Sequence, residues 1–422
     1  MMPSPFPTLA GRLSRRRFIT GAGALAGLSA LHAPARFASA MDAPVLPPLP
    51  AGHIPQQSAS TFLLNIGHTP VHVLSKPQMA PTVNGSMPAP TLRWREGDEV
   101  SLHLHNTMDE ETSIHWHGLR CPANMDGVPG LSFGGIAPGQ TFTYRFMLKQ
   151  SGTYWYHSHS NMQEAKGLYG AIVIDPKGGE TRHYDRDYVI VLSDWSDVEP
   201  SDIIKNLKFQ SDYYTFRQRT EASFVPDARR DGVLPVLKNR LQWAGMNMSA
   251  TDISDVSGII YTYLMNGQTP HANWTGLFAP GERIRLRFIN ASAMTFYDIR
   301  IPGLPMTIIQ SDGNDVEPVQ VDEFRIGVAE TYDCIVVPQA TQAYTIFAQS
   351  EDRTGYARGT LAPRAGMSAA IPPMDPRPVR TMLDMGMGSD MKMGGMDMKA
   401  MAHQPKADTP PLNVENQNVA AM

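Results

Sequence analysis

The stretch Gly152-Thr153-Tyr154-Trp155-Tyr156-His157-Ser158-His159 is a short, mainly apolar run that starts at a glycine and ends in a His-x-His pair. Its length and its aromatic residues predict a strand. Comparable short runs follow one another along the chain between clusters of turn-forming residues, and the chain holds 35 Gly and 35 Pro. This pattern favours an all-β protein over a helical bundle. Other expected strands are Thr61–Ile66, Val100–His105, Phe142–Leu148, Ala171–Ile174 and Tyr188–Leu192.

An internal repeat predicts two related domains. An Asn-Gly pair is followed by a Gly-initiated strand and then by an Asn nine residues after that Gly, and this order occurs twice. Two tandem Greek-key β-sandwiches, residues 61–180 and 181–363, are the economical interpretation. Residues 198–250 are polar and partly helical in pattern, so we expect an insertion there. The two copies are Asn84-Gly85, Gly97-Asp98-Glu99-Val100 and Asn106, and Asn266-Gly267, Gly281-Glu282-Arg283-Ile284 and Asn290.

The first 40 residues have the three parts of an export signal. Arg15-Arg16-Arg17 precede a small apolar stretch from Gly21 to Leu31, and Ala38-Ser39-Ala40 provides a cleavage site. The paired arginines indicate the twin-arginine export machinery and a periplasmic protein; a disordered basic leader is the alternative. The apolar stretch is too short and too rich in glycine for a stable membrane span, and no later segment is long enough. Residues 41–60 are rich in proline and are expected to be a linker.

Charge and cysteine content exclude some classes of function. Residues 1–40 hold five arginines and no acidic residue, so their removal takes the net charge from −4 to about −9. We therefore expect no nucleic-acid partner for the mature protein. The chain has only two cysteines, Cys121 and Cys334, far apart in sequence. We expect two buried free thiols rather than a bridge, although export makes a bridge possible.

Two His-x-His pairs are the candidate metal ligands. They are His115-Trp116-His117, followed by Gly118, and His157-Ser158-His159. Residues i and i+2 of a strand face the same side, so each pair can aim two imidazoles at one point. Neutral imidazole suits copper, zinc, iron and nickel, and four converging imidazoles suit either one metal or a cluster of metals. A third pair, His103-Leu104-His105, lacks a following Gly-rich turn and is predicted to be structural or on the surface.

The motifs together resemble a known family. Ser113–Gly118, Met125–Gly130 and Gly152–His159 are similar to the first cupredoxin domain of a multicopper oxidase. The arginine-rich leader, Leu192-Ser193-Asp194-Trp195 and a Met-rich tract resemble the copper-resistance (CopA-like) subfamily. The resemblance covers nearly the whole chain after residue 50. It implies tandem cupredoxin-like sandwiches that bind copper.

The resemblance also implies roles for single residues. His115 would bind the type 2 copper, and His117, His157 and His159 would bind the type 3 pair. Asp126 resembles the family carboxylate that helps deliver protons to reduced oxygen; its alternative role is to cap the turn before Gly127. The reaction of the family is the oxidation of Cu(I) or phenolic substrates, coupled to the reduction of dioxygen to water.

The sequence departs from the family after His159. Four further cluster histidines and the type 1 copper of the family belong to a third cupredoxin domain, but this chain has only His183, His271 and His403 there, all isolated. Neither cysteine is flanked by histidines. We therefore expect that the chain stops before the third domain, that the type 1 site is absent, and that the chain alone is nearly inactive as an oxidase.

The second repeat lacks the histidines of the first. It reads Thr295-Phe296-Tyr297-Asp298 where the first copy has His115-Trp116-His117, which predicts a metal-free second domain. A copper-free scaffold throughout is a further alternative, and the intact His pairs of the first domain count against it.

The tail, residues 364–422, has its own chemistry. Residues 382–401 contain eight methionines. Thioether sulfur is soft and selects Cu(I). The interspersed glycines argue against the alternative, a packing helix, so a mostly disordered tail is expected. We expect the tract to gather Cu(I), to feed an oxidase site or, in a non-enzymatic alternative, to sequester it. The candidate ligands are Met385, Met387, Met391, Met393, Met396 and Met398.

Overall fold

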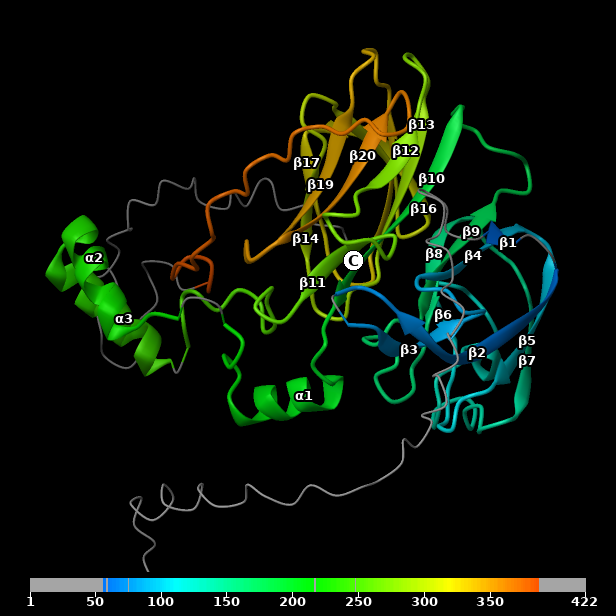
Figure 1. Cartoon of the computed structure of the whole chain (residues 1–422), viewed down its shortest axis with the longest axis horizontal. Coiled ribbons are helices and arrows are strands. Elements are labelled where there is room, and N and C mark those ends of the chain that lie inside the picture. Colours follow the sequence, from blue (N-terminus) through cyan, green and yellow to red (C-terminus); the bar gives the residue numbers. More distant parts are fainter. Residues whose placement is uncertain (1–55, 58–59, 75, 216–217, 247, 387–422) are drawn as a thin grey trace, which may run out of the picture. The chain divides into compact units, whose positions relative to one another are not determined.

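Two β-sandwiches make up most of the part of the chain that the computed structural model describes, which is residues 56–57, 60–74, 76–215, 218–246 and 248–386 (Figure 1). Each sandwich consists of two sheets around an apolar core. The expected strands all fall on observed strands, and the all-β fold class is confirmed. The Met-rich tail after residue 386 lies outside the described residues.

The first sandwich has the sheet orders β3-β2-β5-β7 and β1-β4-β9-β8-β6. On β2, buried residues such as Leu64 and Ile66 alternate with outward residues such as Asn65, because side chains in a strand alternate between the two faces. A 3-10 helix, Ala123–Met125, follows β6. The strands are β1 (Gln56–Gln57), β2 (Thr61–Val71), β3 (Gln78–Val83), β4 (Ala89–Arg95), β5 (Glu99–Asn106), β6 (His115–His117), β7 (Thr141–Met147), β8 (Gly152–His157) and β9 (Tyr169–Asp175).

The second sandwich has the sheet orders β11-β10-β13-β18-β15-β16 and β12-β20-β19-β14-β17. Its core holds fully buried aromatic and branched residues such as Phe288 and Ile346. The strands are β10 (Arg186–Trp195), β11 (Thr262–Met265), β12 (Trp274–Leu277), β13 (Ile284–Asn290), β14 (Tyr297–Arg300), β15 (Met306–Ser311), β16 (Asn314–Val321), β17 (Glu323–Ile326), β18 (Thr331–Val336), β19 (Tyr344–Ser350) and β20 (Tyr356–Ala362).

The two sandwiches repeat one topology. In the first, β2 pairs in parallel with β5, and β6 pairs antiparallel with β8. In the second, β10 pairs in parallel with β13, and β14 pairs antiparallel with β19. The strand β14 therefore takes the place that the histidine strand β6 has in the first sandwich.

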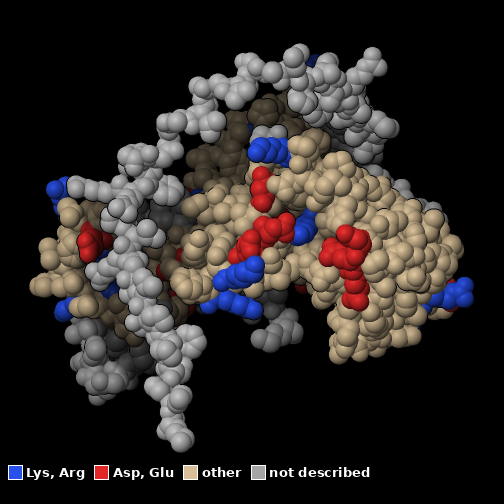
Figure 2. Space-filling model, turned by 60° about the horizontal axis from the view of Figure 1, so that its bottom comes forward, with Lys and Arg blue, Asp and Glu red and all other residues tan. Residues whose placement is uncertain are grey.

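Three helices lie between β10 and β11. They are α1 (Pro200–Phe209), α2 (Glu221–Asp231) and α3 (Val233–Gly245). Helix α2 starts with a capping box, in which the Thr220 hydroxyl accepts from the Ser223 N–H and the Ser223 hydroxyl accepts from the Thr220 N–H. Of the helices described, none combines the length and the apolar character needed to cross a membrane. Figure 2 shows one face of the molecule, on which acidic and basic side chains lie in small mixed groups.

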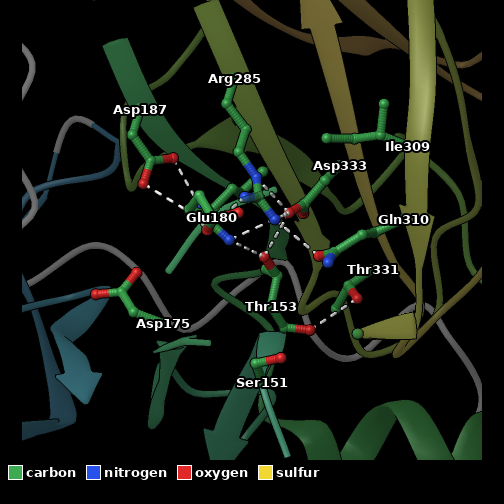
Figure 3. A network of polar contacts seen from close by, with 12 residues as sticks. Ser151, Thr153, Asp175, Glu180, Asp187, Arg285, Ile309, Gln310, Thr331 and Asp333 are labelled. Atoms are coloured by element: carbon green, nitrogen blue, oxygen red, sulfur yellow. Dashed lines mark hydrogen bonds and ion pairs between the residues drawn. The ribbon is translucent and has the colours of Figure 1, made fainter. Parts of the chain in front are cut away.

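The two sandwiches contact each other through the sheet faces that carry β8 and β13. Arg285 and Arg287 of β13 are almost fully buried and share the carboxylate of Asp333 on β18. The Thr153 hydroxyl of β8 donates to the same carboxylate at 2.9 Å, so one hydrogen-bond network joins the two sandwiches (Figure 3). Beside it lies an apolar cluster made of Trp155, Tyr169 and Ala171 from the first sandwich and Val191, Ile289 and Ala291 from the second.

Candidate metal centre

The four candidate histidines lie at the end of the β6–β8 strand pair. The strands are antiparallel and place His115 opposite His157. On β6 the indole of Trp116 points into the apolar core, so both flanking imidazoles point to the opposite face. The second pair differs from the expectation, because β8 ends at His157 and His159 lies beyond it. Its backbone N–H is held by the Ser113 hydroxyl at 3.0 Å.

The imidazole rings converge. The ring centroids of His115 and His159 are 4.9 Å apart, those of His157 and His159 are 4.9 Å apart, and those of His115 and His157 are 5.5 Å apart. One ring nitrogen from each of these three residues lies within 4.8 Å of the other two. His117 joins through its Nδ1, which lies 3.4 Å from His157 Nε2. The structure thus brings all four together.

The spacing of these nitrogens fits a metal. Two nitrogens bound to one tetrahedral ion at about 2.0–2.1 Å lie about 3.4 Å apart, and His117 Nδ1 and His157 Nε2 are 3.4 Å apart. The ligand atoms of His115, His157 and His159 lie within 4.8 Å of one another, so the four imidazoles can serve one ion or neighbouring ions. The donor set of imidazoles only is one that copper accepts.

Two hydrogen bonds fix which ring nitrogens face the centre. His115 Nδ1 donates to the backbone carbonyl of Asp126 at 2.7 Å. His157 Nδ1 donates to Glu164 Oε2 at 2.5 Å. Each bond occupies Nδ1 and directs Nε2 toward the centre, where it can bind a metal; metal-binding histidines commonly have such a second partner.

Burial favours the neutral form of three of the imidazoles, those of His115, His117 and His159. It lowers the pKa of His117 to about 4, and the nearby imidazoles of His157, His115 and His159 lower that pKa further. Burial is also the largest cause of the lowered pKa of His115 and of His159. A neutral imidazole need not release a proton before it binds a metal. At neutral pH these three rings are therefore ready to act as ligands.

The indole of Trp155 forms one wall of the centre. It stacks on the His157 ring with a centroid distance of 4.1 Å and an interplanar angle of 11°. Its centroid also lies 5.0 Å from that of His117. Since Trp155 is almost fully buried, it shields both imidazoles from water on this side.

Asp126 lies beside His115. Its carboxylate Oδ1 is 3.4 Å from His115 Nδ1 and accepts a hydrogen bond from the Cys121 thiol at 3.6 Å.

Burial and the Asp126 carboxylate raise the pKa of Cys121 to about 12, so the thiol keeps its proton. Both cysteines are free, but Cys121 is half-buried rather than buried as expected. The reason is that it lies in a loop after β6 and not in a strand.

Sequence reasoning missed Glu164 and Trp155 as parts of the centre. Glu164 lies in a turn segment after β8, and no spacing rule pairs it with His157.

The third His-x-His pair lies apart from the centre, with Nδ1 of His103 and His105 hydrogen-bonded to Thr143 and Thr141 of β7. Of the candidate methionines, Met385 lies half-buried in a turn. The others, Met387, Met391, Met393, Met396 and Met398, lie outside the described residues.

The corresponding place in the second sandwich holds ion pairs. Asp298 of β14 accepts two hydrogen bonds from Arg325, at 2.8 and 3.0 Å, and forms an ion pair with Arg353. Glu351, directly after β19, pairs with the same Arg325 at 2.8 Å. Guanidinium groups and carboxylates therefore stand where the first sandwich has imidazoles.

Two family models match the chain, and both describe a multicopper oxidase. They cover residues 65–179 and residues 237–366, together more than half of the chain. The chain belongs to the multicopper oxidase family. The first match includes all four histidines of the centre, and the second covers most of the second sandwich.

Among the relatives that are similar to this chain are two copper-resistance proteins. The chain is 59% identical to Copper resistance protein A of Escherichia coli over 345 residues, which is 80% of this chain and 57% of that protein. It is 54% identical to Copper resistance protein A of Pseudomonas syringae pv. tomato, over 92% of this chain and 62% of that protein. The chain thus spans less than two thirds of the length of these relatives.

Solved structures share the fold. The laccase from Botrytis aclada matches with a TM-score of 0.56 and 26% identity, over 78% of this chain and 56% of that one. Fet3p, a multicopper oxidase that functions in iron import, matches with a TM-score of 0.57 and 25% identity, over 76% of this chain and 54% of that one.

Proposed function

We propose that the protein is a periplasmic copper-resistance oxidase whose four histidines form the N-terminal half of a type 2 and type 3 copper cluster. The observation that carries the proposal is the convergence of four imidazoles, with His117 Nδ1 and His157 Nε2 3.4 Å apart and the Nδ1 atoms of His115 and His157 occupied by other partners. The likeness to Copper resistance protein A supports the biological role. Export by the twin-arginine machinery is part of the same proposal.

The roles that we propose for the four histidines and Asp126 are those that the family resemblance implies. His115 binds the type 2 copper, and His117, His157 and His159 bind the type 3 pair. Bound copper would supply the one-electron redox chemistry by which the family couples oxidation of Cu(I) or phenolic substrates to reduction of dioxygen. Asp126 helps to deliver protons to reduced oxygen, and its position 3.4 Å from His115 Nδ1 supports this role.

We further propose that these 422 residues alone reduce little or no dioxygen. A type 1 copper needs a cysteine thiolate and two histidines, and neither Cys121 nor Cys334 has a histidine as a neighbour in sequence. Burial raises the pKa of Cys334 and keeps its thiol protonated, which disfavours it as a ligand. In an oxygen electrode with a reducing substrate, sustained oxygen uptake by this chain would contradict this part of the proposal.

Replacement of His117 and His157 by alanine tests the copper site. Because these residues supply the closest pair of nitrogens, the double variant should lose at least one tightly bound Cu(II) per chain, measured by metal analysis after dialysis. The matched control is His103→Ala with His105→Ala, a second His-x-His whose rings contact Thr143 and Thr141 instead. It should keep the full copper content. Equal copper in both double variants would contradict the proposal.

A second candidate function is non-enzymatic sequestration of copper. It is favoured by the eight methionines of residues 382–401, since neutral thioethers select Cu(I). Deletion of residues 387–401 should then remove at least one bound Cu(I), measured by competition with a coloured Cu(I) chelator. The Cu(II) content at the histidines should not change. An unchanged Cu(I) content would exclude the tract as a binding site.

A further inference from the structure

One face of β8 carries both a metal ligand and the contacts with the second sandwich. Tyr154 and Tyr156 point into the core of the first sandwich. Because side chains alternate along a strand, Thr153, Trp155 and His157 share the opposite face. Thr153 enters the hydrogen-bond network with Asp333, and Trp155 enters the apolar cluster that includes residues of β10 and β13. His157, next along the same face, belongs to the metal centre.

The start of this face is held by hydrogen bonds. The Thr153 hydroxyl donates to Asp333 at 2.9 Å and accepts from Arg287 at 2.9 Å. The Thr331 hydroxyl donates to the backbone carbonyl of Thr153 at 3.0 Å. All three partners belong to the second sandwich, and Figure 3 shows Thr153 pointing into their network. The second sandwich therefore fixes the backbone of β8 four residues before His157.

The middle of the face is held by packing alone. Trp155 is 1% exposed, and its buried indole N–H has no hydrogen-bond partner among the described residues. Its place is thus set by the apolar cluster to which it belongs, and Val191 and Ile289 of the second sandwich are members of the same cluster. An indole without a hydrogen bond can shift or turn when one of its packing neighbours is removed.

The Trp155 indole in turn contacts the rings of two candidate ligands, His157 and His117. It is nearly parallel to the His157 ring at 4.1 Å and lies 5.0 Å from the His117 ring. The bond from His157 Nδ1 to Glu164 fixes one edge of the imidazole, and Trp155 fixes its plane. Glu164 belongs to the first sandwich, whereas half of the apolar cluster that contains Trp155 comes from the second, namely Val191, Ile289 and Ala291.

We propose that the second sandwich is a positioning element for the copper centre: its residues Val191 and Ile289 press Trp155 against His157 and His117 and so set the geometry of these two ligands. The inference rests on the proposed function, since it presupposes that the four histidines bind copper. In this view the metal-free second sandwich determines how tightly copper binds. Ile289 is a positioning residue and does not contact the metal.

Two matched substitutions test the proposal in the full chain. Ile289→Ala opens space behind Trp155. Ile346→Ala removes the same atoms from another fully buried isoleucine of the second sandwich, which lies in its interior core and not in the cluster of Trp155. Both variants should unfold at lower temperature, because each leaves a cavity. Only Ile289→Ala should also bind Cu(II) less tightly, about tenfold, as is typical for the loss of a ligand's support.

Two measurements are made. The metal-free protein is titrated with Cu(II) while the quenching of tryptophan fluorescence is recorded, and the copper-loaded protein is studied by electron paramagnetic resonance. Ile289→Ala should change the copper hyperfine splitting, and Ile289→Val, which removes one methyl group, should restore most of the affinity. Equal Cu(II) affinity in Ile289→Ala and Ile346→Ala would overturn the inference. If the unsubstituted chain binds no Cu(II) at the four histidines, the proposed function itself fails.

Discussion

Replacing Asp333 by alanine should lower the free energy of unfolding by about 3–5 kcal/mol, because truncation of one partner leaves buried charges without compensation. Asp333 is 1% exposed. Its Oδ2 accepts from Arg285 at 2.6 Å, from Arg287 at 3.2 Å and from Thr153 at 2.9 Å. Arg285 keeps Glu180 and Arg287 keeps Asp187, but both guanidinium groups lose the carboxylate that they share. Urea unfolding, monitored by circular dichroism, measures the change in the free energy of unfolding.

The control is an acidic residue at the surface. Asp202 pairs with Lys205 on α1 at 2.8 Å, and both side chains are more than half exposed. Asp202→Ala should change the free energy of unfolding by less than about 0.5 kcal/mol, as is usual for exposed pairs. A loss below about 1 kcal/mol for Asp333→Ala would mean that water or a rearranged side chain replaces the buried carboxylate.

Replacing Glu164 by alanine should weaken copper binding at the four histidines by about ten- to a hundredfold. Glu164 accepts the hydrogen bond of His157 Nδ1 at 2.5 Å, which holds the proton on that nitrogen and presents Nε2 to the centre. Without the carboxylate the ring can turn, or can carry its proton on Nε2, and either change blocks the ligand atom. Competitive titration with a Cu(II) chelator gives the affinity.

A graded pair of variants separates the charge of Glu164 from its hydrogen bond. Glu164→Gln keeps an acceptor oxygen for His157 Nδ1 and should lose less affinity than Glu164→Ala. Glu110→Ala is the control, because Glu110 accepts from Asn161 and has no hydrogen bond or ion pair with an imidazole among the residues that the structure describes. It should bind copper as the unsubstituted protein does. Identical affinities of the Glu164→Ala and Glu110→Ala variants would show that Glu164 does not support the centre.

The strands and the histidine pairs could be predicted because both depend on local periodicity. The alternation of apolar and polar residues in β5 reports on the two faces of a sheet, and the short aromatic run of β8 between turn signals marks a buried strand. The face shared by His115 and His117 follows from the same rule. His159 did not follow it, since β8 ends at His157, yet the Ser113 hydroxyl still holds its backbone near the other ligands.

The support of the centre could not be predicted, because it depends on contacts between distant segments. Glu164 reaches His157 only through the turns that follow β8. Trp155 shares its apolar cluster with Ile289, which lies in the other sandwich. Within the sequence, Trp155 looks like any aromatic residue of a buried strand. The half-buried state of Cys121 likewise depends on how the loop after β6 folds over Asp126.

The ion pairs of the second sandwich limit where a cation can settle. A divalent ion that reached the end of β14 and β19 would find the oxygens of Asp298 and Glu351 already engaged by arginines. To bind there it would have to break those contacts and remain beside two permanent positive charges. Of two places built on the same arrangement of strands, one offers imidazoles that can bind a metal, and the other offers carboxylates that arginines already occupy.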